Sequence, residues 1–147
     1  MESIFNFPNT VAAVITVIVV VLCVLLHYEV LNLASAYLIK RPKLKRRRVL
    51  LLVFVILLTH IVEVWIFAIG FVVLAGAQFG ELVGLHGHML TDYAYYSATV
   101  YSTLGFGDIV PVGSMQLLTG TEAITGLVLI TWSASFTFLE MHRFWEN

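Results

Sequence analysis

Three long apolar runs, separated by short polar segments, constrain this chain more than any other feature. They cover residues 11–39, 49–77 and 115–141, and each is long enough for a helix to cross a hydrocarbon core about 30 Å thick. Hydrophobic residues make up 60% of the 147 residues, whereas a soluble domain stays near about half. The sequence therefore predicts a single all-α membrane domain, with three transmembrane helices and no separate soluble ligand domain.

The basic residues lie almost entirely in one place. Seven of the eight lysines and arginines fall between Lys40 and Arg48. A basic run can bind nucleic acid, but between two membrane spans it is typical of a cytoplasmic loop. We therefore expect residues 40–48 to be cytoplasmic and residues 78–91 to be an extracellular loop, with no nucleic-acid partner.

This orientation places the N-terminus outside the cell and the C-terminus in the cytoplasm. We interpret the first run as a retained span rather than a signal peptide, because the residues before it carry no basic side chain and the run is long.

Between the second and third runs lies the segment TDYAYYSATVYSTLGFGDIVP, residues 91–111. It predicts a short helix after Thr91, with Thr91 as the N-cap and Asp92 at the positive end of the helix dipole. Gly105 and Gly107 flank one aromatic residue, and glycine allows a backbone to alternate between left- and right-handed conformations. Such alternation turns successive carbonyl oxygens the same way, and a ring of these segments would replace the water shell of a cation.

Residues 103–108 read TLGFGD and resemble the selectivity filter of the potassium channels, whose usual form is TVGYGD. The resemblance extends to a pair of pore-helix aromatics, a pair of hydroxyl residues before the filter, and a proline after it. In this sequence these are Tyr95-Tyr96, Ser102-Thr103 and Pro111. Two positions differ from the family pattern: Leu104 replaces valine, and Phe106 replaces tyrosine, which removes a hydroxyl that normally tethers the filter to the pore helix.

The resemblance implies a pore helix and filter over residues 92–108 and a homotetramer in a lipid bilayer. Potassium ions would bind backbone carbonyl oxygens of the filter, and Asp108 would anchor the filter through Tyr95 or Thr99. The implied ion-binding residues are Thr103, Leu104, Gly105, Phe106 and Gly107, and the implied supporting residues are Asp108, Tyr95, Tyr96 and Thr99.

The function implied by the resemblance is passive, potassium-selective conduction across the cell membrane, with K⁺ as the permeant ion and no other cofactor. We expect no enzyme, because the intramembrane carboxylates and histidines form no recognisable catalytic spacing. We also expect no voltage sensor, because no span carries a regular arginine series. The alternatives are a weakly selective cation channel and a non-conducting membrane scaffold subunit whose loop is only structural.

In the third run, one helical face carries Thr119, Glu122, Gly126, Ser133 and Thr137. The small and hydroxyl residues on this face would let neighbouring helices approach closely. Gly126 resembles the glycine at which potassium-channel inner helices bend. The resemblance then places the cavity lining on the adjoining side, at Leu127, Ile130 and Ala134.

In the second run, Thr59, His60 and Glu63 share a face with Ile56, Phe67 and Gly70. Ionisable groups at this depth are costly unless they lie against protein or water, so we expect this face to point inward. At about 1.5 Å per residue, Glu63 and Glu122 fall near one level of the bilayer. One hypothesis is that Glu122, with Glu63 or His60, couples pH to the filter. The alternative is a fixed hydrogen bond between helices.

Two metal sites also enter consideration. His60 and Glu63, three residues apart, suit a metal, but the chain has no second such pair, which favours a hydrogen-bonded packing role. His86 and His88 could bind a divalent ion at the pore mouth if several copies converge. The polar residues near the inner end of the first run, among them His27, are expected at the interface or against neighbouring helices.

Overall fold

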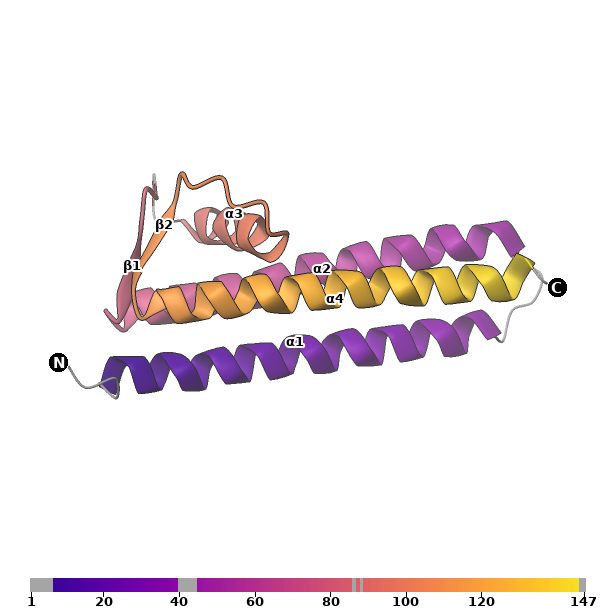
Figure 1. Cartoon of the computed structure of the whole chain (residues 1–147), viewed down its shortest axis with the longest axis horizontal. Helices are drawn as coiled ribbons and strands as arrows, with labels where there is room; N and C mark the ends of the chain where they lie inside the picture. The colour runs from indigo at the N-terminus through magenta and orange to yellow at the C-terminus, as the bar shows by residue number, and fades with distance from the viewer. Residues whose placement is uncertain (1–6, 40–44, 86, 88, 146–147) are drawn as a thin grey trace.

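The computed structural model describes residues 7–39, 45–85, 87 and 89–145. Three long helices and one short helix carry most of this part of the chain, with two short strands beside the short helix (Figure 1). In chain order the elements are α1 (Phe7–Ile39), α2 (Lys45–Gly76), β1 (Gly80–Val83), α3 (Leu90–Tyr101), β2 (Val110–Gly113) and α4 (Met115–Trp145). Helices α1, α2 and α4 are long and apolar enough to cross a membrane. The predicted all-α membrane fold is confirmed.

The helices extend beyond the apolar runs that predicted them. Helix α1 begins at Phe7 rather than at residue 11, and α4 continues to Trp145 rather than ending at residue 141. Helix α2 begins at Lys45, so residues 45–48 are helical where a loop was expected. Lysine and arginine are good helix formers, and the hydropathy of a span does not mark where its helix ends. Residues 40–44 of the expected loop lie outside the described part of the chain.

Helices α2 and α4 form a central pair. Helix α1 packs along one side of this pair, and α3 packs against α2 and α4 on the opposite side (Figure 1). Helix α3 lies toward the end of the bundle at which α1 begins, and α4 ends beside the start of α2. The core between the helices includes Phe67, Phe71 and Leu74 of α2 and Met115 and Leu118 of α4, all fully buried.

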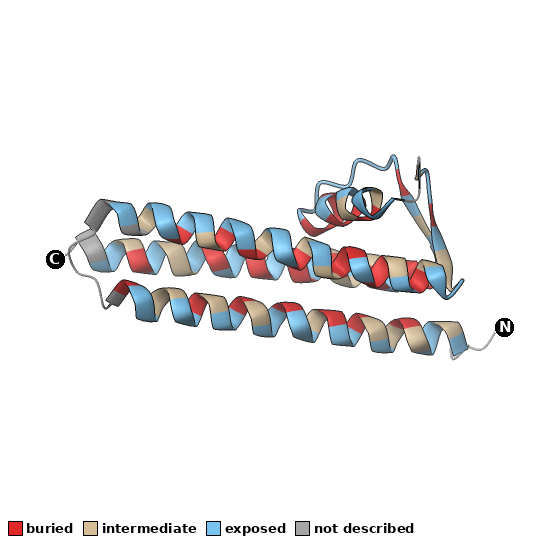
Figure 2. Ribbon diagram, turned by 180° about the vertical axis from the view of Figure 1, so that it is seen from behind, coloured by how far each residue is buried: buried red, intermediate tan, exposed pale blue. Residues whose placement is uncertain are grey.

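Buried residues follow the sides of the helices that face one another, and exposed residues cover the outer sides (Figure 2). Many of the exposed residues on α1 and α2 are large and apolar, such as Leu25, Leu33, Phe54 and Leu58. An apolar outer surface of this extent suits contact with lipid. The inward face predicted for α2 is confirmed, since Thr59 and Glu63 are buried and His60 is half-buried.

The strands were not predicted from the sequence. β1 pairs with β2 in antiparallel register, with Gly80 opposite Gly113 and Val83 opposite Val110. A Cβ at Gly80 would collide with the carbonyl oxygen of Val112, so glycine permits this close pairing. The two strands lie before α3 and after the filter segment, and their pairing closes the loop that carries both.

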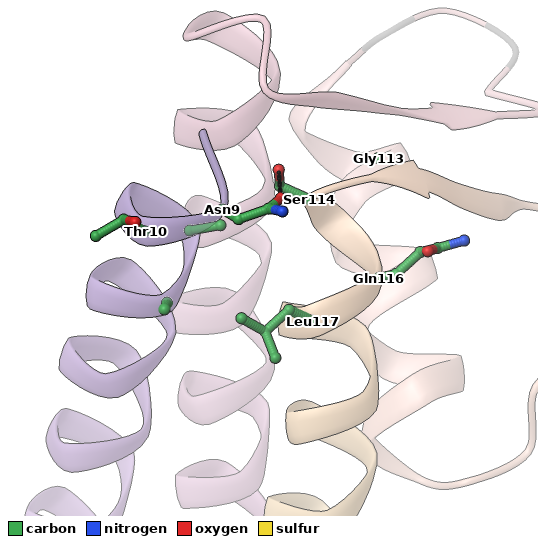
Figure 3. Close-up of a pocket in the computed structure, with 8 residues that line it drawn as sticks. Asn9, Thr10, Gly113, Ser114, Gln116 and Leu117 are labelled. Carbon is green, nitrogen blue, oxygen red and sulfur yellow. Dashed lines mark hydrogen bonds between the residues drawn. The ribbon is translucent and has the colours of Figure 1, made fainter. Parts of the chain in front are cut away.

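A cavity of about 470 Å³ lies where the start of α1 meets the start of α4. The Asn9 and Ser114 side chains point toward each other there (Figure 3), and the Ser114 hydroxyl donates to Oδ1 of Asn9 at 2.8 Å. This polar contact joins the beginning of α1 to the residue that follows β2.

Candidate functional site: the pore loop and its supports

The N-terminus of α3 is capped differently from the prediction. The N-cap residue is Met89 rather than Thr91, and Asp92 occupies the third position of the helix. The Asp92 carboxylate accepts hydrogen bonds from the backbone N–H groups of Gly87 and Met89, at 3.2 and 3.3 Å. Asp92 therefore supplies both the negative charge expected at the helix start and the cap that was assigned to Thr91.

The backbone after α3 alternates in handedness. Thr103, Gly105 and Gly107 have φ angles of +59°, +52° and +79°, whereas Leu104 and Phe106 between them do not have positive φ. The left-handed positions at the two glycines confirm the alternation predicted for this segment. Thr103 is the unusual member, because a β-branched residue rarely adopts positive φ.

The segment is fastened to the end of α3 by backbone hydrogen bonds. The N–H groups of Thr103 and Gly105 donate to the carbonyl oxygens of Val100 and Thr99, at 2.9 and 3.0 Å. The last carbonyl groups of a helix have no partner within the helix, so these bonds satisfy two of them. They also set where the filter segment begins relative to α3.

Tyr95 supports the outer part of the segment. Its hydroxyl donates to Oδ2 of Asp108 at 2.8 Å, which confirms one of the two anchors expected for Asp108. The hydrogen bond to Asp108 raises the pKa of the Tyr95 hydroxyl above its ordinary value, so Tyr95 remains a donor. The Tyr95 ring also stacks on Phe106, with ring centroids 6.5 Å apart.

The other two expected supports act elsewhere. Thr99 donates to the carbonyl oxygen of Tyr96, one turn back in its own helix, rather than to Asp108. The Tyr96 hydroxyl is hydrogen-bonded to Thr119 of α4 at 2.9 Å. Tyr96 thus fixes α3 against α4, and Thr99 holds the segment after α3 through its backbone carbonyl, which accepts from Gly105.

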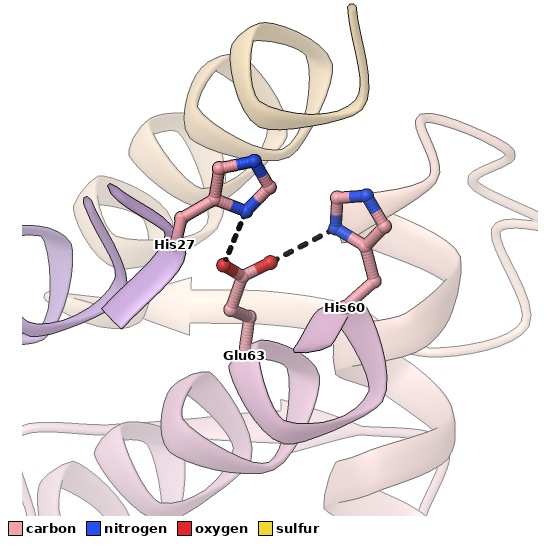
Figure 4. A group of neighbouring side chains, drawn as sticks. All are labelled: His27, His60 and Glu63. Carbon is pink, nitrogen blue, oxygen red and sulfur yellow. Dashed lines mark hydrogen bonds and ion pairs between the residues drawn. The ribbon is translucent and has the colours of Figure 1, made fainter. Parts of the chain in front are cut away.

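A buried polar network surrounds Glu63 of α2 (Figure 4). The carboxylate is fully buried, and its two oxygens lie 2.9 Å from Nδ1 of His27 and 2.9 Å from Nδ1 of His60. The Tyr101 hydroxyl donates to Oε2 of Glu63 at 2.5 Å. The His60–Glu63 contact agrees with the hydrogen-bonded role predicted for that pair.

Sequence reasoning missed His27 as a member of this network. It is fully buried on α1 against neighbouring helices, which was one of the two places expected for it, but its contact with Glu63 was not predicted. Ser133 of α4 completes the group, with its hydroxyl 3.1 Å from Nε2 of His27 and 3.2 Å from Nε2 of His60. All four helices therefore contribute a side chain to one network. The sequence feature that could have indicated this role is a single histidine, His27, within an apolar run.

A model of the ion channel family matches residues 49–141. The chain belongs to this family. The matched region begins within α2, contains α3 and the filter segment, and ends within α4, while α1 lies outside it. Comparisons with curated proteins and with solved structures gave no match.

In this channel Glu122 does not join the network around Glu63. Its carboxylate is fully buried and contacts the Ser97 hydroxyl at 2.5 Å, and its Oε2 atom has no hydrogen-bond partner in the described part of the chain. The direct contact with Glu63 or His60 that the pH hypothesis requires is therefore absent. The Glu122 carboxylate instead contacts Ser97 of α3, whose hydroxyl also lies beside the Val64 carbonyl oxygen of α2.

Gly126 of the channel lies in a continuous stretch of α4, which runs unbroken from Met115 to Trp145. A Cβ on Gly126 would collide with the backbone carbonyl oxygen of Tyr101. Glycine at this position thus allows α4 to touch the C-terminal end of α3. The hinge role stays a prediction. His86 and His88, the other predicted metal ligands, lie outside the described residues.

Proposed function

We propose that the chain is one quarter of a potassium-selective channel that conducts K⁺ passively through a homotetrameric pore. The alternating backbone at Thr103, Gly105 and Gly107 carries this proposal. In a ring of four such segments, successive carbonyl oxygens would face the axis and replace the hydration shell of the ion. The resemblance of TLGFGD to the potassium-channel filter favours K⁺ as that ion.

Ions would bind at the carbonyl oxygens of the filter, with the Thr103 hydroxyl contributing at its inner end. Helix α3 would assist from behind, since the C-terminal end of a helix carries a partial negative charge that stabilises a cation in front of it. The hydrogen bonds from Thr103 and Gly105 to the last turn of α3 support this arrangement, because they attach the filter at that end of the helix.

The proposed cavity lies below the filter and is lined by Leu127, Ile130 and Ala134. In the single chain these side chains are exposed on α4, on the side next to the buried Gly126. An apolar wall offers no tight ligand to the ion. A hydrated cation can therefore pass it without being held.

A tetramer is proposed because one chain supplies one filter segment. Leu104 and Phe106 are 60% and 62% exposed in the single chain, which leaves apolar surface beside the filter for neighbouring copies to cover. Two shallow apolar grooves of about 410 and 480 Å³ flank His60, one between α2 and α4 and one between α2 and α3. Neighbouring subunits would cover the α2 side of these grooves, while Ile130 and Ala134 on the α4 side would face the proposed cavity.

The proposed location is the cell membrane, with the filter toward the outside. The basic residues at the start of α2 favour a cytoplasmic position for that end of the helix. Helix α3 and the start of α1 lie at the opposite end of the bundle (Figure 1), so in this orientation the N-terminus would be outside and the C-terminus inside. A potassium filter needs the same orientation.

The test is ion flux in liposomes that contain only this protein. We expect K⁺ flux that external Ba²⁺ blocks, with Na⁺ flux at least tenfold smaller. A weakly selective channel would instead pass K⁺ and Na⁺ at comparable rates, and a scaffold subunit would pass neither. Either of these results contradicts the proposal.

A further inference from the structure

We propose that His27, His60 and Glu63 bind a divalent transition-metal ion, with Zn²⁺ as the favoured ion. We call these three residues the histidine–glutamate cluster. One ligand atom from each residue lies within 4.8 Å of the other two. The cluster lies outside the filter, and the inference neither uses nor requires potassium selectivity.

The ligand atoms are of the right kind and converge. Nδ1 of His27 and Nδ1 of His60 each lie 2.9 Å from one oxygen of the same carboxylate, and the two rings lie side by side (Figure 4). Two imidazoles with one carboxylate form a common ligand set for Zn²⁺. The Tyr101 hydroxyl, 2.9 Å from Nδ1 of His60, supplies an oxygen at a fourth position.

The second nitrogen of each histidine decides between a metal and a simple hydrogen-bond network. When Nδ1 of a neutral histidine binds a metal, Nε2 carries the proton and must donate it to an acceptor. Both Nε2 atoms lie beside one Ser133 hydroxyl, at 3.1 and 3.2 Å. A hydroxyl oxygen has two lone pairs, so Ser133 can accept both protons.

Without a metal, two neutral histidines cannot satisfy these contacts. If both Nδ1–H groups donate to Glu63, both Nε2 atoms become acceptors that face Ser133. Ser133 has one proton and can donate to only one of them. In the other Ser133–Nε2 contact, a lone pair of the hydroxyl oxygen then faces a lone pair of the nitrogen, unless the cluster holds an additional proton. A bound metal removes this conflict and leaves both histidines neutral.

Charge points the same way. Glu63 is fully buried in a membrane-spanning helix, where a carboxylate is costly unless a positive charge lies beside it. Residues 1–39 and 49–142 contain no lysine or arginine. The spans therefore offer no permanently positive side chain at this depth, and a dication would supply the missing charge.

The consequence is a link between α1 and the pore-forming part of the chain. His27 comes from α1, His60 and Glu63 from α2, and Tyr101 from the last turn of α3. Because the ion would bind the folded chain and not the unfolded one, occupancy should raise thermal stability and chelation should lower it. The site is thus inferred to hold α1 in place behind the filter.

The experiment uses the whole purified protein with His86 and His88 changed to alanine, because that loop pair could itself bind metal. Zinc content after dialysis against Zn²⁺, and the shift of Tm on adding Zn²⁺ or EDTA, are measured on this background. We expect one Zn²⁺ per chain and a Tm that rises with Zn²⁺. His27→Gln and Glu63→Gln should each lower the zinc affinity at least tenfold, and Ser133→Ala about tenfold through loss of the shared acceptor.

His142→Ala serves as the matched control and should leave zinc binding unchanged. If a ligand variant fails to fold, Co²⁺ added to the otherwise unmodified background protein should still give the visible absorption of a histidine-bound ion. Absence of that absorption, or less than stoichiometric zinc, overturns the proposal. So does a Tm that responds to pH but not to Zn²⁺ or EDTA, since an extra proton would then complete the network.

Discussion

Tyr95 donates a hydrogen bond of 2.8 Å to Asp108 across the outer half of the filter segment. The two residues lie 13 positions apart, one on α3 and the other directly after the glycine-rich turn. This bond links a side chain of α3 to the last residue of the proposed filter, Asp108. It therefore restrains the part of the loop that lacks backbone bonds to α3.

Replacing Tyr95 with phenylalanine tests this link. Tyr95→Phe keeps the ring that stacks on Phe106 and removes the hydroxyl that bonds Asp108. We expect channels that open but stop conducting sooner, measured as a shorter mean open time in single-channel records. Asp108→Asn should add little to Tyr95→Phe in the double mutant, because both changes remove one contact. Fully additive effects would mean that the two side chains act separately.

The filter glycines are expected to be intolerant of any side chain. Gly105→Ala and Gly107→Ala place a Cβ on backbone with φ of +52° and +79°, which costs about 1–2 kcal/mol per residue. We expect selective potassium flux to be lost while the tetramer still assembles. Gly120→Ala is the matched control, since it lies within α4 and its Cβ would meet nothing within 4 Å. Potassium-selective flux from either filter mutant would refute the filter assignment.

Phe106→Tyr restores the hydroxyl usual in the potassium-channel filter. Phe106 is 62% exposed in the single chain, so the added hydroxyl is not sterically excluded by its own subunit. We expect a better braced filter, and hence a longer open time or a larger steady current, in planar bilayers. An unchanged current with unchanged potassium sensitivity would show that the stacking on Tyr95 already braces this position.

Gly126→Ala should destabilise the channel. The new Cβ would overlap the Tyr101 carbonyl oxygen, and neither backbone segment can move without shifting α3 or α4. Overpacking of this kind costs about 1–3 kcal/mol, so we expect a lower Tm in detergent than for Gly120→Ala. Equal Tm values for the two variants would mean that α3 and α4 separate easily here.

Glu122→Gln tests the pH hypothesis. The Ser97 hydroxyl lies within hydrogen-bonding distance of both the Val64 carbonyl oxygen and Glu122, but it has only one proton to donate. Both contacts are satisfied if the Ser97 hydroxyl donates to the Val64 carbonyl oxygen and a protonated Glu122 donates to the Ser97 hydroxyl. The side-chain amide of glutamine can donate in the same way. We therefore expect the wild-type dependence of current on pH. A shifted curve would show that Glu122 titrates and senses pH.

Features with a local cause were predictable from the sequence. The three spans follow from apolar composition, and the alternating filter backbone follows from Gly105 and Gly107. The inward face of α2 follows from the helical spacing of Thr59, His60 and Glu63. The Tyr95–Asp108 bond was one of two alternatives, and only the geometry of the turn decides between them.

Features that depend on how separate helices meet were not predictable. His27 is 36 residues from Glu63, and no sequence spacing relates them because they lie on separate helices, α1 and α2. The pairing of β1 with β2 rests on four residues each, too few for an alternating pattern to be read. Glu122 was expected to meet Glu63 or His60, but its carboxylate contacts Ser97 of α3 instead.

The contact between Gly126 and the Tyr101 carbonyl has a mechanical consequence. Tyr101 lies two residues before Thr103, where the filter segment begins, and the contact is made by backbone on one side and a bare Cα on the other. If α4 bends at Gly126, the bend occurs where α4 contacts Tyr101, directly before the filter segment. In the proposed tetramer, movement of the C-terminal half of α4 would then displace Thr103 at the start of the filter segment, so that one motion would govern both ends of the proposed pore.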